Sequence, residues 1–277
     1  MSVSETAGQT GGDAAAAARA AAAGRAATLL RAGATIGLGS GRAVAAVIAA
    51  AAARWPDGPP LLVAAASTET DRLAHAAGFP VVALDDLELR RGAGAGAATT
   101  GAAATGANRT DAAPGAARRP LLDLVIDGAD EVDPRLDMIK GGGGALLRER
   151  LIAAAAARVV IVVEDEKLVA RLGERHALPV EVVRFAWRET RARLLELVPT
   201  ARLRRAADGR AFVTDEGHHI LDCDLPTPAA GGGEGLAALA AALKALPGVV
   251  DHGLFLGIAD EVLVGHPDGA VDTLTRT

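Results

Sequence analysis

Residues 126–150 hold side chains whose types and spacing could do chemistry, within the run IDGADEVDPRLDMIKGGGGALLRER. In chain order they are Asp127, Asp130, Lys140, Gly141–Gly144 and Glu149. A carboxylate pair, a cation, a glycine run and a further carboxylate suit the removal of a proton next to a carbonyl group. A positioned base contributes roughly 10²–10⁴-fold to such a step. A backbone donor that stabilises charge on the oxygen contributes about 10²–10³-fold.

The elements expected around these residues would position them at one edge of a sheet. The run PLLDLVID is typical of a buried strand, so Asp127 lies at its carboxyl end, where open α/β sheets bind ligands. Gly128 and Ala129 keep the following turn small. A glycine run at a helix start lets backbone N–H groups approach an anion or oxyanion. Glu149 lies just over one turn into that helix, and its side chain can lean back toward the glycines.

Each of these residues also has a plainer interpretation. The acids from Asp127 to Glu131 could be solvated loop residues, and we expect this of Asp133 and Asp137. Lys140 could be a surface residue. Their combination at one strand end favours a site instead. No Ser-His-Asp order is apparent, and no metal-ligand spacing relates the histidines, so we predict no metal; they are His75, His176, His218, His219, His252 and His266.

A second glycine loop, GLGSGRAV, follows the first predicted strand. It is not a dinucleotide fingerprint, because Arg42 or Val44 stands where the third glycine is needed. It is not a P-loop, because no Gly-Lys-Ser/Thr follows. A backbone nest for a phosphate, with Ser40 and Arg42 as donors, fits better. The alternative interpretation, a tight strand-to-helix turn that binds no ligand, is equally well supported by the sequence.

Strands alternate with helices in the first part of the chain, which predicts a doubly wound, mostly parallel, Rossmann-like α/β sheet with right-handed crossovers. The predicted strands lie in ATIGL and at 60–67, 79–87, 120–127 and 158–165. The predicted helices lie at 13–32, 42–55, 68–78 with a Thr68 cap, and 145–157. We assign residues 14–175 and 250–277 to this catalytic domain.

Residues 176–249 predict a second, smaller α+β domain, with a helix near 188–198, a turn near Glu216-Gly217 and a helix in GLAALAAALKAL. The segment GVVDHGLFLGIADEVLVGHPDG is expected to return the chain to the main sheet. Residues 1–13 are expected to be a disordered N-terminus. Residues 91–119, rich in Gly, Ala and Thr, are expected to form a flexible surface insertion. A lid or partner-binding role is the alternative for that insertion.

Composition narrows the class of protein. The 277 residues are 50% hydrophobic but only 2% aromatic, so the core must be built from Ala, Val, Leu and Ile. A net charge of −5 with scattered basic residues argues against a nucleic-acid partner, although it allows an anionic small molecule. Cys223 is the only cysteine, which excludes an internal disulfide. With no signal peptide and no membrane-spanning run, we expect a cytoplasmic protein without membrane contact.

The motifs together resemble those of the ribose-5-phosphate isomerase type A family. They are GLGSG, ASTET, DLVIDGADEVD, MIKGGGGALLRERLI, EDEKLV, LPVEV, FVTDEG, ILDC and GVVDHGLFLG, in the family's order. The resemblance covers roughly residues 15–270, apart from the insertion. It implies the interconversion of ribose 5-phosphate and ribulose 5-phosphate in the pentose phosphate pathway, without a metal or cofactor. It also implies a ferredoxin-like smaller domain and a homodimer or a dimer of dimers.

The resemblance also implies roles for individual residues. Glu149 would be the general base that moves a proton between C1 and C2 through an enediol, and Lys140 would help to stabilise the oxyanion. Asp127 and Asp130 would bind the sugar, with Asp127 assisting ring opening. The other implied substrate-binding residues are Ser40, Gly41, Arg42, Ala43, Gly128, Ala129, Gly141, Gly142, Gly143 and Lys167.

The sequence departs from the family pattern in its first glycine loop. The family usually has Gly-Thr-Gly-Ser-Thr where this chain has Gly-Ser-Gly-Arg-Ala, so Arg42 and Ala43 replace two hydroxyl residues. Arg42 could supply a charge-assisted bond to phosphate instead. Counting back from this loop places Arg19 where the family often has a lysine near the phosphate.

Two other hypotheses are open. A non-catalytic sugar-phosphate sensor would have a related fold, but such domains come attached to a DNA-binding module, for which the short N-terminus has no room. An amino-sugar phosphate deaminase or a coenzyme A transferase would share the broad fold. Neither is expected to carry the DGADEVD and KGGGG block.

Overall fold

The structure is a computed structural model that describes residues 3–87, 120–226 and 233–276. The predicted insertion at 91–119 therefore lies outside the described residues. The chain forms two compact units. The first comprises Met1–Gly128, Leu151–Asp165 and Gly257–Thr277, and the second comprises Ala129–Arg150 and Glu166–Leu256.

The first unit is built on a six-stranded sheet in the order β13-β12-β6-β3-β1-β2. The strands are β1 (Thr35–Leu38), β2 (Leu62–Ala65), β3 (Leu124–Asp127), β6 (Val159–Glu164), β12 (Glu261–Gly265) and β13 (Val271–Thr275). All pairs are parallel except that of β13 with β12. The five parallel strands have the doubly wound order 2-1-3-4-5, whose switch point lies between β1 and β3. The predicted fold class is confirmed.

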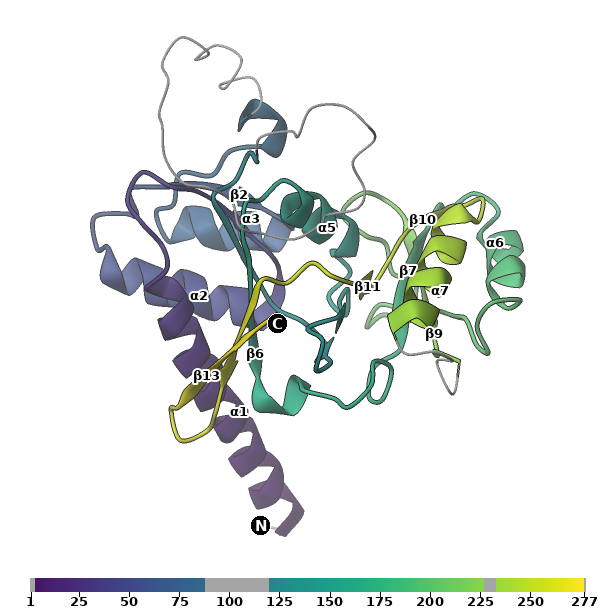
Figure 1. Ribbon diagram of the computed structural model, residues 1–277, viewed down its shortest axis with the longest axis horizontal. Coiled ribbons are helices and arrows are strands. Elements are labelled where there is room, and N and C mark those ends of the chain that lie inside the picture. Colours follow the sequence, from purple (N-terminus) through teal and green to yellow (C-terminus); the bar gives the residue numbers. More distant parts are fainter. Residues whose placement is uncertain (1–2, 88–119, 227–232, 277) are drawn as a thin grey trace. The chain divides into compact units, whose positions relative to one another are not determined.

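Helices cover both faces of this sheet (Figure 1). They are α1 (Val3–Ala27), α2 (Gly41–Arg54), α3 (Thr68–Ala76) and α5 (Leu146–Ala154). Alternate strand residues such as Ile36, Ile126 and Val160 pack with α1 and α2 in one apolar core. Ile152 of α5 packs on the opposite face beside Gly37, where an added Cβ would lie 2.3 Å from it. The core consists of Ala, Val, Leu and Ile with few aromatic side chains, as the composition predicts.

The second unit contains a four-stranded antiparallel sheet in the order β10-β7-β9-β8. Its elements are β7 (Leu178–Val182), α6 (Trp187–Leu194), β8 (Arg202–Leu203), β9 (His219–Cys223), α7 (Gly233–Ala245) and β10 (Val249–His252). A β-α-β-β-α-β succession with this 4-1-3-2 strand order is ferredoxin-like, as predicted. The unit also holds a three-stranded sheet of β4 (Glu131–Val132), β5 (Met138–Ile139) and β11 (Leu254–Phe255).

The division between the units differs from the predicted one. Residues 129–150 and 166–175 belong to the second unit rather than to the Rossmann-like domain. The reason is pairing that sequence spacing does not reveal, because β5 pairs with both β4 and β11, and Val132 bridges Leu168. The chain also returns to the main sheet only at β12, since β10 pairs with β7.

Three local predictions differ from the structure. Residues 79–87 form no strand: Val81 makes one isolated bridge to Val63, and residues 84–87 are helical. Pro80 offers no N–H to a ladder, which limits the pairing. The first helix begins at Val3, within the stretch predicted to be disordered, because a formed helix extends at low cost. The cap of α3 is Ser67, whose side chain accepts from the Thr70 N–H, rather than Thr68.

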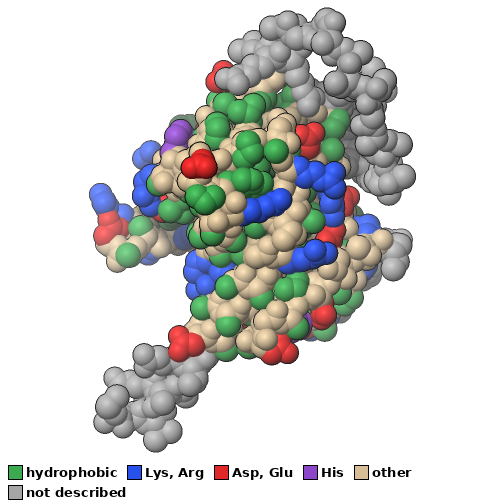
Figure 2. Space-filling view, turned by 90° about the vertical axis from the view of Figure 1, so that its left-hand side faces the viewer, with side chains coloured by type: hydrophobic (Ala, Val, Ile, Leu, Met, Phe, Trp, Pro, Cys, Tyr) green, Lys and Arg blue, Asp and Glu red, His purple; other side chains and the backbone are tan. Residues whose placement is uncertain are grey.

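The surface agrees with the scattered charges of the sequence. On the face in Figure 2, basic and acidic side chains are interspersed with hydrophobic ones instead of gathering into a basic stripe. Among the described residues, no helix is long and apolar enough to cross a bilayer.

Candidate active site

The first glycine loop lies at the switch point of the six-stranded sheet. The Gly39 N–H donates to Ile126 O at 2.9 Å, and the Ser40 N–H donates to Asp127 Oδ1 at 3.1 Å. The Gly128 N–H donates to the same oxygen at 2.7 Å. Asp127 is 2% exposed. A Cβ on Gly39 would lie 1.8 Å from the carboxylate of Asp127, so only glycine fits at position 39. The loop and the acid therefore form one packed cluster.

The same loop starts α2. Ser40 is its N-cap residue, and Gly41 has φ +83°, a conformation that favours glycine. Arg42 lies exposed in the first turn, and Ala43 is half-buried. A helix N-terminus presents unsatisfied N–H groups and partial positive charge, so this turn can hold an anion. The predicted strand, glycine turn and helix are confirmed here.

The second cluster joins Lys140 to Glu149. Lys140 Nζ lies 3.3 Å from Glu149 Oε2, and the two side chains are only 4% and 5% exposed. Lys140 Nζ also lies 5.5 Å from the centroid of the Phe255 ring. The Lys140 N–H donates to Gly253 O at 2.9 Å, which ties the strand before the glycines to the chain before Phe255. Lys140 is a buried partner of the acid and not a surface residue.

The glycine run beside this pair forms a hydrogen-bonded turn whose backbone conformation favours glycine. Gly141 and Gly144 have φ +100° and +87°, and the Gly144 N–H donates to Gly141 O at 3.0 Å. The Gly142 N–H donates to Asp130 Oδ2 at 2.7 Å. Gly142 and Gly143 are exposed. The loop therefore brings backbone donors, a buried cation and a buried carboxylate into one cluster of the second unit.

The other predicted residues are placed as follows. Lys167 ends a short 3₁₀ helix, Asp165–Lys167, after β6 and is half-buried. Ala129 is half-buried as well. Arg19 of α1 pairs with Glu164 through its Nε at 2.5 Å, and its side chain is 15% exposed. The contact available to Arg19 is thus a carboxylate at the carboxyl end of β6.

Comparison with known proteins decides the family. Residues 98–269 match the family model of ribose 5-phosphate isomerase A (phosphoriboisomerase A). The ribose-5-phosphate isomerase A of Roseiflexus sp. (strain RS-1) is 41% identical over 242 residues, 87% of this chain and 88% of that protein. The chain belongs to the ribose-5-phosphate isomerase A family. It is an aldose-ketose isomerase of the pentose phosphate pathway that interconverts ribose 5-phosphate and ribulose 5-phosphate.

Solved structures agree with the assignment to ribose-5-phosphate isomerase A. The enzyme of Methanocaldococcus jannaschii is 28% identical with a TM-score of 0.74, and the match covers 93% of this chain and 97% of that one. A D-ribose-5-phosphate isomerase in complex with phospho-erythronic acid is 27% identical, with the same TM-score and the same coverage.

Several acids of this isomerase are buried where solvation was expected. Glu131 is 0% exposed, and its carboxylate accepts the N–H groups of Gly173, Arg175 and His176 at 2.6–2.7 Å. Asp133 is 6% exposed and accepts the Asp137 N–H at 3.0 Å. The solvated interpretation is wrong for Glu131 and Asp133, because the buried N–H groups that they accept need buried acceptors. It is also wrong for Asp137, which is 7% exposed and pairs with Arg135. Glu131 thus holds the segment 173–176, and Asp133 closes the turn that ends at Asp137.

Sequence reasoning missed one residue that contacts the glycine run of the isomerase. Arg204 donates to the carbonyl oxygens of Gly141 and Gly142. Nothing in the sequence marks it, since it is one of 29 basic residues and lies outside the 126–150 block. Within the described parts of the chain, no group of three His, Cys, Asp or Glu side chains is arranged as metal ligands would be.

Proposed function

We propose that Glu149 is the general base of the isomerisation and that Lys140 with the Gly141–Gly143 donors stabilises the oxygen charge. The observation that carries the proposal is the buried contact of 3.3 Å between Lys140 Nζ and Glu149 Oε2. A carboxylate, an ammonium group and a glycine loop that can supply backbone N–H groups are the parts that proton transfer next to a carbonyl requires.

The proposed reaction moves one proton from C2 to C1 and a second proton from the C2 oxygen to the C1 oxygen. In the open-chain aldose, Glu149 takes the proton from C2, and the C–H electrons form a C1–C2 double bond. The charge that moves onto the C1 oxygen is stabilised by Lys140 and the loop. Glu149 then returns the proton to C1 while the proton of the C2 hydroxyl passes to the C1 oxygen, so that C1 becomes a primary alcohol and C2 becomes the ketone. The product is ribulose 5-phosphate, and no atom is gained or lost.

Burial supports this division of roles. Charges in a dry site interact more strongly than in water, so an oxyanion near Lys140 is stabilised more than it would be at the surface. The base contributes roughly 10²–10⁴-fold and a loop donor about 10²–10³-fold. The loop donors are backbone groups that need little reorganisation during the reaction.

We assign binding of the substrate to the remaining predicted residues. The first turn of α2, with Ser40, Gly41, Arg42 and Ala43, would bind the phosphate. The buried Asp127 would assist ring opening. The other predicted contacts to the sugar are Gly128, Ala129, Asp130 and Lys167. A phosphorylated sugar acid bound to a related isomerase supports an anion site in this fold.

The test is formation of ribulose 5-phosphate from ribose 5-phosphate by wild type and Glu149→Gln, both with EDTA present. We expect the wild type to be active and kcat of the variant to fall by about 10²–10⁴-fold. Titration calorimetry with phospho-erythronic acid should give similar Kd values for both proteins. Near wild-type turnover of Glu149→Gln would disprove the assignment of the base. Loss of wild-type activity in EDTA would disprove the metal-free mechanism.

We further propose that the enzyme works as a homodimer, or a dimer of dimers, in the cytoplasm. The family resemblance supports the oligomer, and the single cysteine supports a reducing compartment. Light scattering on the purified full chain measures the mass directly. A mass equal to that of one chain would contradict the oligomer.

A further inference from the structure

We propose that Arg204 is a positioning residue that fixes the peptide groups of Gly141 and Gly142, so that the Gly142 N–H stays on Asp130 and the Gly143 N–H faces the substrate oxygen. The inference rests on the proposed role of this run as an oxyanion donor. It assigns a function to a side chain distant in sequence from the 126–150 block.

Arg204 contacts the run directly. Its Nη1 donates to Gly141 O at 2.8 Å and to Gly142 O at 3.0 Å. Its Nε and Nη2 donate to the two carboxylate oxygens of Asp222, at 3.0 and 2.5 Å. The Arg204 side chain is only 15% exposed. One guanidinium therefore spans from an acid on β9 to two consecutive carbonyl groups of the loop.

Peptide planarity converts these contacts into an orientation of donors. In a trans peptide the C=O and the following N–H point in opposite directions. With its carbonyl on Arg204, Gly141 directs the Gly142 N–H away from the guanidinium, and that N–H reaches Asp130. In the same way Gly142 directs the N–H of the exposed Gly143 away from Arg204. Since the Gly142 N–H is bonded to Asp130, the Gly143 N–H is the donor that Arg204 directs toward an oxyanion on the opposite side of the loop.

The loop needs such a contact because glycines hold their conformation poorly. Four consecutive glycines lose much backbone freedom on ordering, and misaligned donors would stabilise an oxyanion less. A charged donor on each carbonyl also polarises the peptide group, which strengthens its N–H as a donor. The Phe212 ring lies 5.9 Å from Arg204 Cζ and packs against Gly144, so it contacts both the guanidinium and the end of the glycine run.

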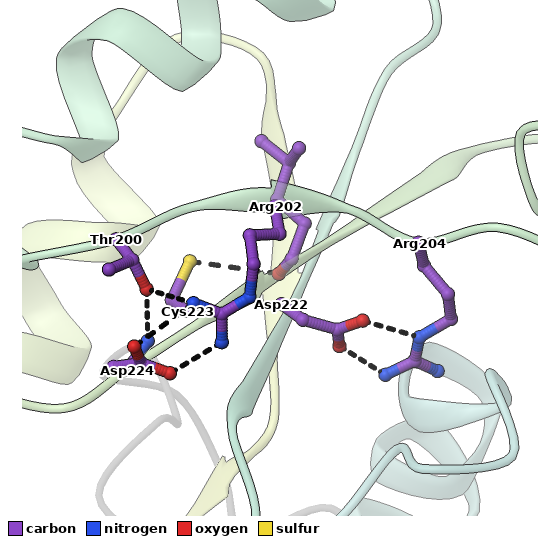
Figure 3. Close-up of polar contacts among 7 residues, drawn as sticks. Thr200, Arg202, Arg204, Asp222, Cys223 and Asp224 are labelled. Atoms are coloured by element: carbon purple, nitrogen blue, oxygen red, sulfur yellow. Dashed lines mark hydrogen bonds and ion pairs between the residues drawn. The ribbon is translucent and has the colours of Figure 1, made fainter.

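A second arginine offers a matched control. Arg202, in β8 and two residues before Arg204, makes a two-pronged pair with Asp224, just as Arg204 does with Asp222 (Figure 3). The side chains of the Arg202 pair are 56% and 45% exposed, against 15% and 24% for the Arg204 pair. Arg202 bonds to Thr200 as its other partner and not to the glycines. The two arginines therefore differ in whether they contact the glycine run.

The experiment compares Arg204→Gln and Arg204→Lys with Arg202→Gln and Arg202→Lys. We expect kcat of Arg204→Gln to fall about 10- to 100-fold, a part of the effect of losing one oxyanion donor, with KM changed less than about threefold. Arg204→Lys should remain impaired, because an ammonium cannot reproduce the planar fork. Both Arg202 variants should keep wild-type kcat. The pH midpoint of kcat should stay in place, since the base is intact.

Chemical rescue separates positioning from a structural role. In Arg204→Ala, added guanidinium chloride at non-denaturing concentration should restore part of kcat, whereas sodium chloride at equal ionic strength should not. Glu149→Gln should gain nothing from either salt.

The outcomes distinguish this inference from the proposed function. Wild-type kcat in a folded Arg204→Gln, with Glu149→Gln inactive, would overturn the role of Arg204 alone. An active Glu149→Gln would overturn the proposed function itself. If Arg204→Gln does not fold, the folded Arg204→Lys decides, and wild-type kcat in it would equally overturn the role.

Discussion

Arg42 is exposed in the first turn of α2, where the family resemblance implies a hydroxyl residue. If it binds the phosphate, Arg42→Ala removes an interaction that the bound substrate and the transition state share equally. We therefore expect KM to rise about 10- to 100-fold, matching the roughly 1.5–3 kcal/mol of a charged hydrogen bond, with kcat nearly unchanged. Steady-state kinetics measure both. Arg25→Ala, an exposed arginine of α1, is the control, and an unchanged KM in Arg42→Ala would count against the phosphate contact.

At the residue scale, the sequence predicts which side chains gather but not how deeply they lie. The proximity of Lys140 and Glu149 could be predicted from the sequence, because helical geometry directs the Glu149 side chain back toward the glycines. The burial of Asp133 could not, because it depends on the turn that this acid closes with the Asp137 N–H. Arg204 could not be found either, since its contact with Gly141 depends on strand pairing in the second unit.

At the element scale, the packing of α1 on β12 depends on one glycine. A Cβ on Gly265 would lie 1.9 Å from Ala18 O, a backbone atom that cannot turn aside. Gly265→Ala must therefore move the helix, at a cost of about 1–3 kcal/mol. We expect a lower midpoint of urea unfolding. Gly24, exposed inside α1 with no atom within 4 Å of an added Cβ, is the matched position.

Gly24→Ala should raise the same midpoint, since alanine is favoured over glycine inside a helix by roughly 0.5–1 kcal/mol. Equal midpoints for the two variants would show that α1 does not approach β12 this closely.

The strands that could be predicted are those whose runs of β-branched residues are buried on both faces. Residues 158–165 illustrate this, because β6 occupies 159–164 and all six of its residues are buried. Residues 79–87 contain similar apolar residues, but they lie beyond β2 at the sheet edge. There Val81 makes one isolated bridge to Val63 and no ladder forms. Hydrophobic pattern alone does not separate these two cases.

At the scale of the whole molecule, stability should depend on pH through His252. Burial, and then the positive charge of Arg150, lowers the pKa of His252 from 6.5 to about 4. Below pH 6.5 the imidazole of His252 binds a proton in the unfolded chain but stays neutral in the folded chain. Its contribution to the free energy of unfolding is therefore fully present above pH 6.5 and is lost as the pH falls to 4. The loss is on the order of 3 kcal/mol.

Urea unfolding at pH 7.5, 6, 5 and 4.5 measures this slope. His252→Asn keeps an acceptor near the Leu254 N–H, which His252 Nδ1 accepts at 3.3 Å, and it removes the titrating ring. We expect a shallower decline of stability in acid for this variant. An identical decline would show that other groups cause the acid sensitivity.

The first unit is assembled from three separate stretches of chain, and this has a consequence for translation. Strand β6 ends at Glu164, but its neighbour β12 begins only at Glu261. At roughly 5–20 residues per second, a ribosome needs on the order of 5–20 s to make the segment between them. Throughout that interval the nascent sheet presents an unpaired, strongly apolar edge. An edge of this kind invites pairing with other chains, so a molecular chaperone that shields β6 would raise the yield of native enzyme.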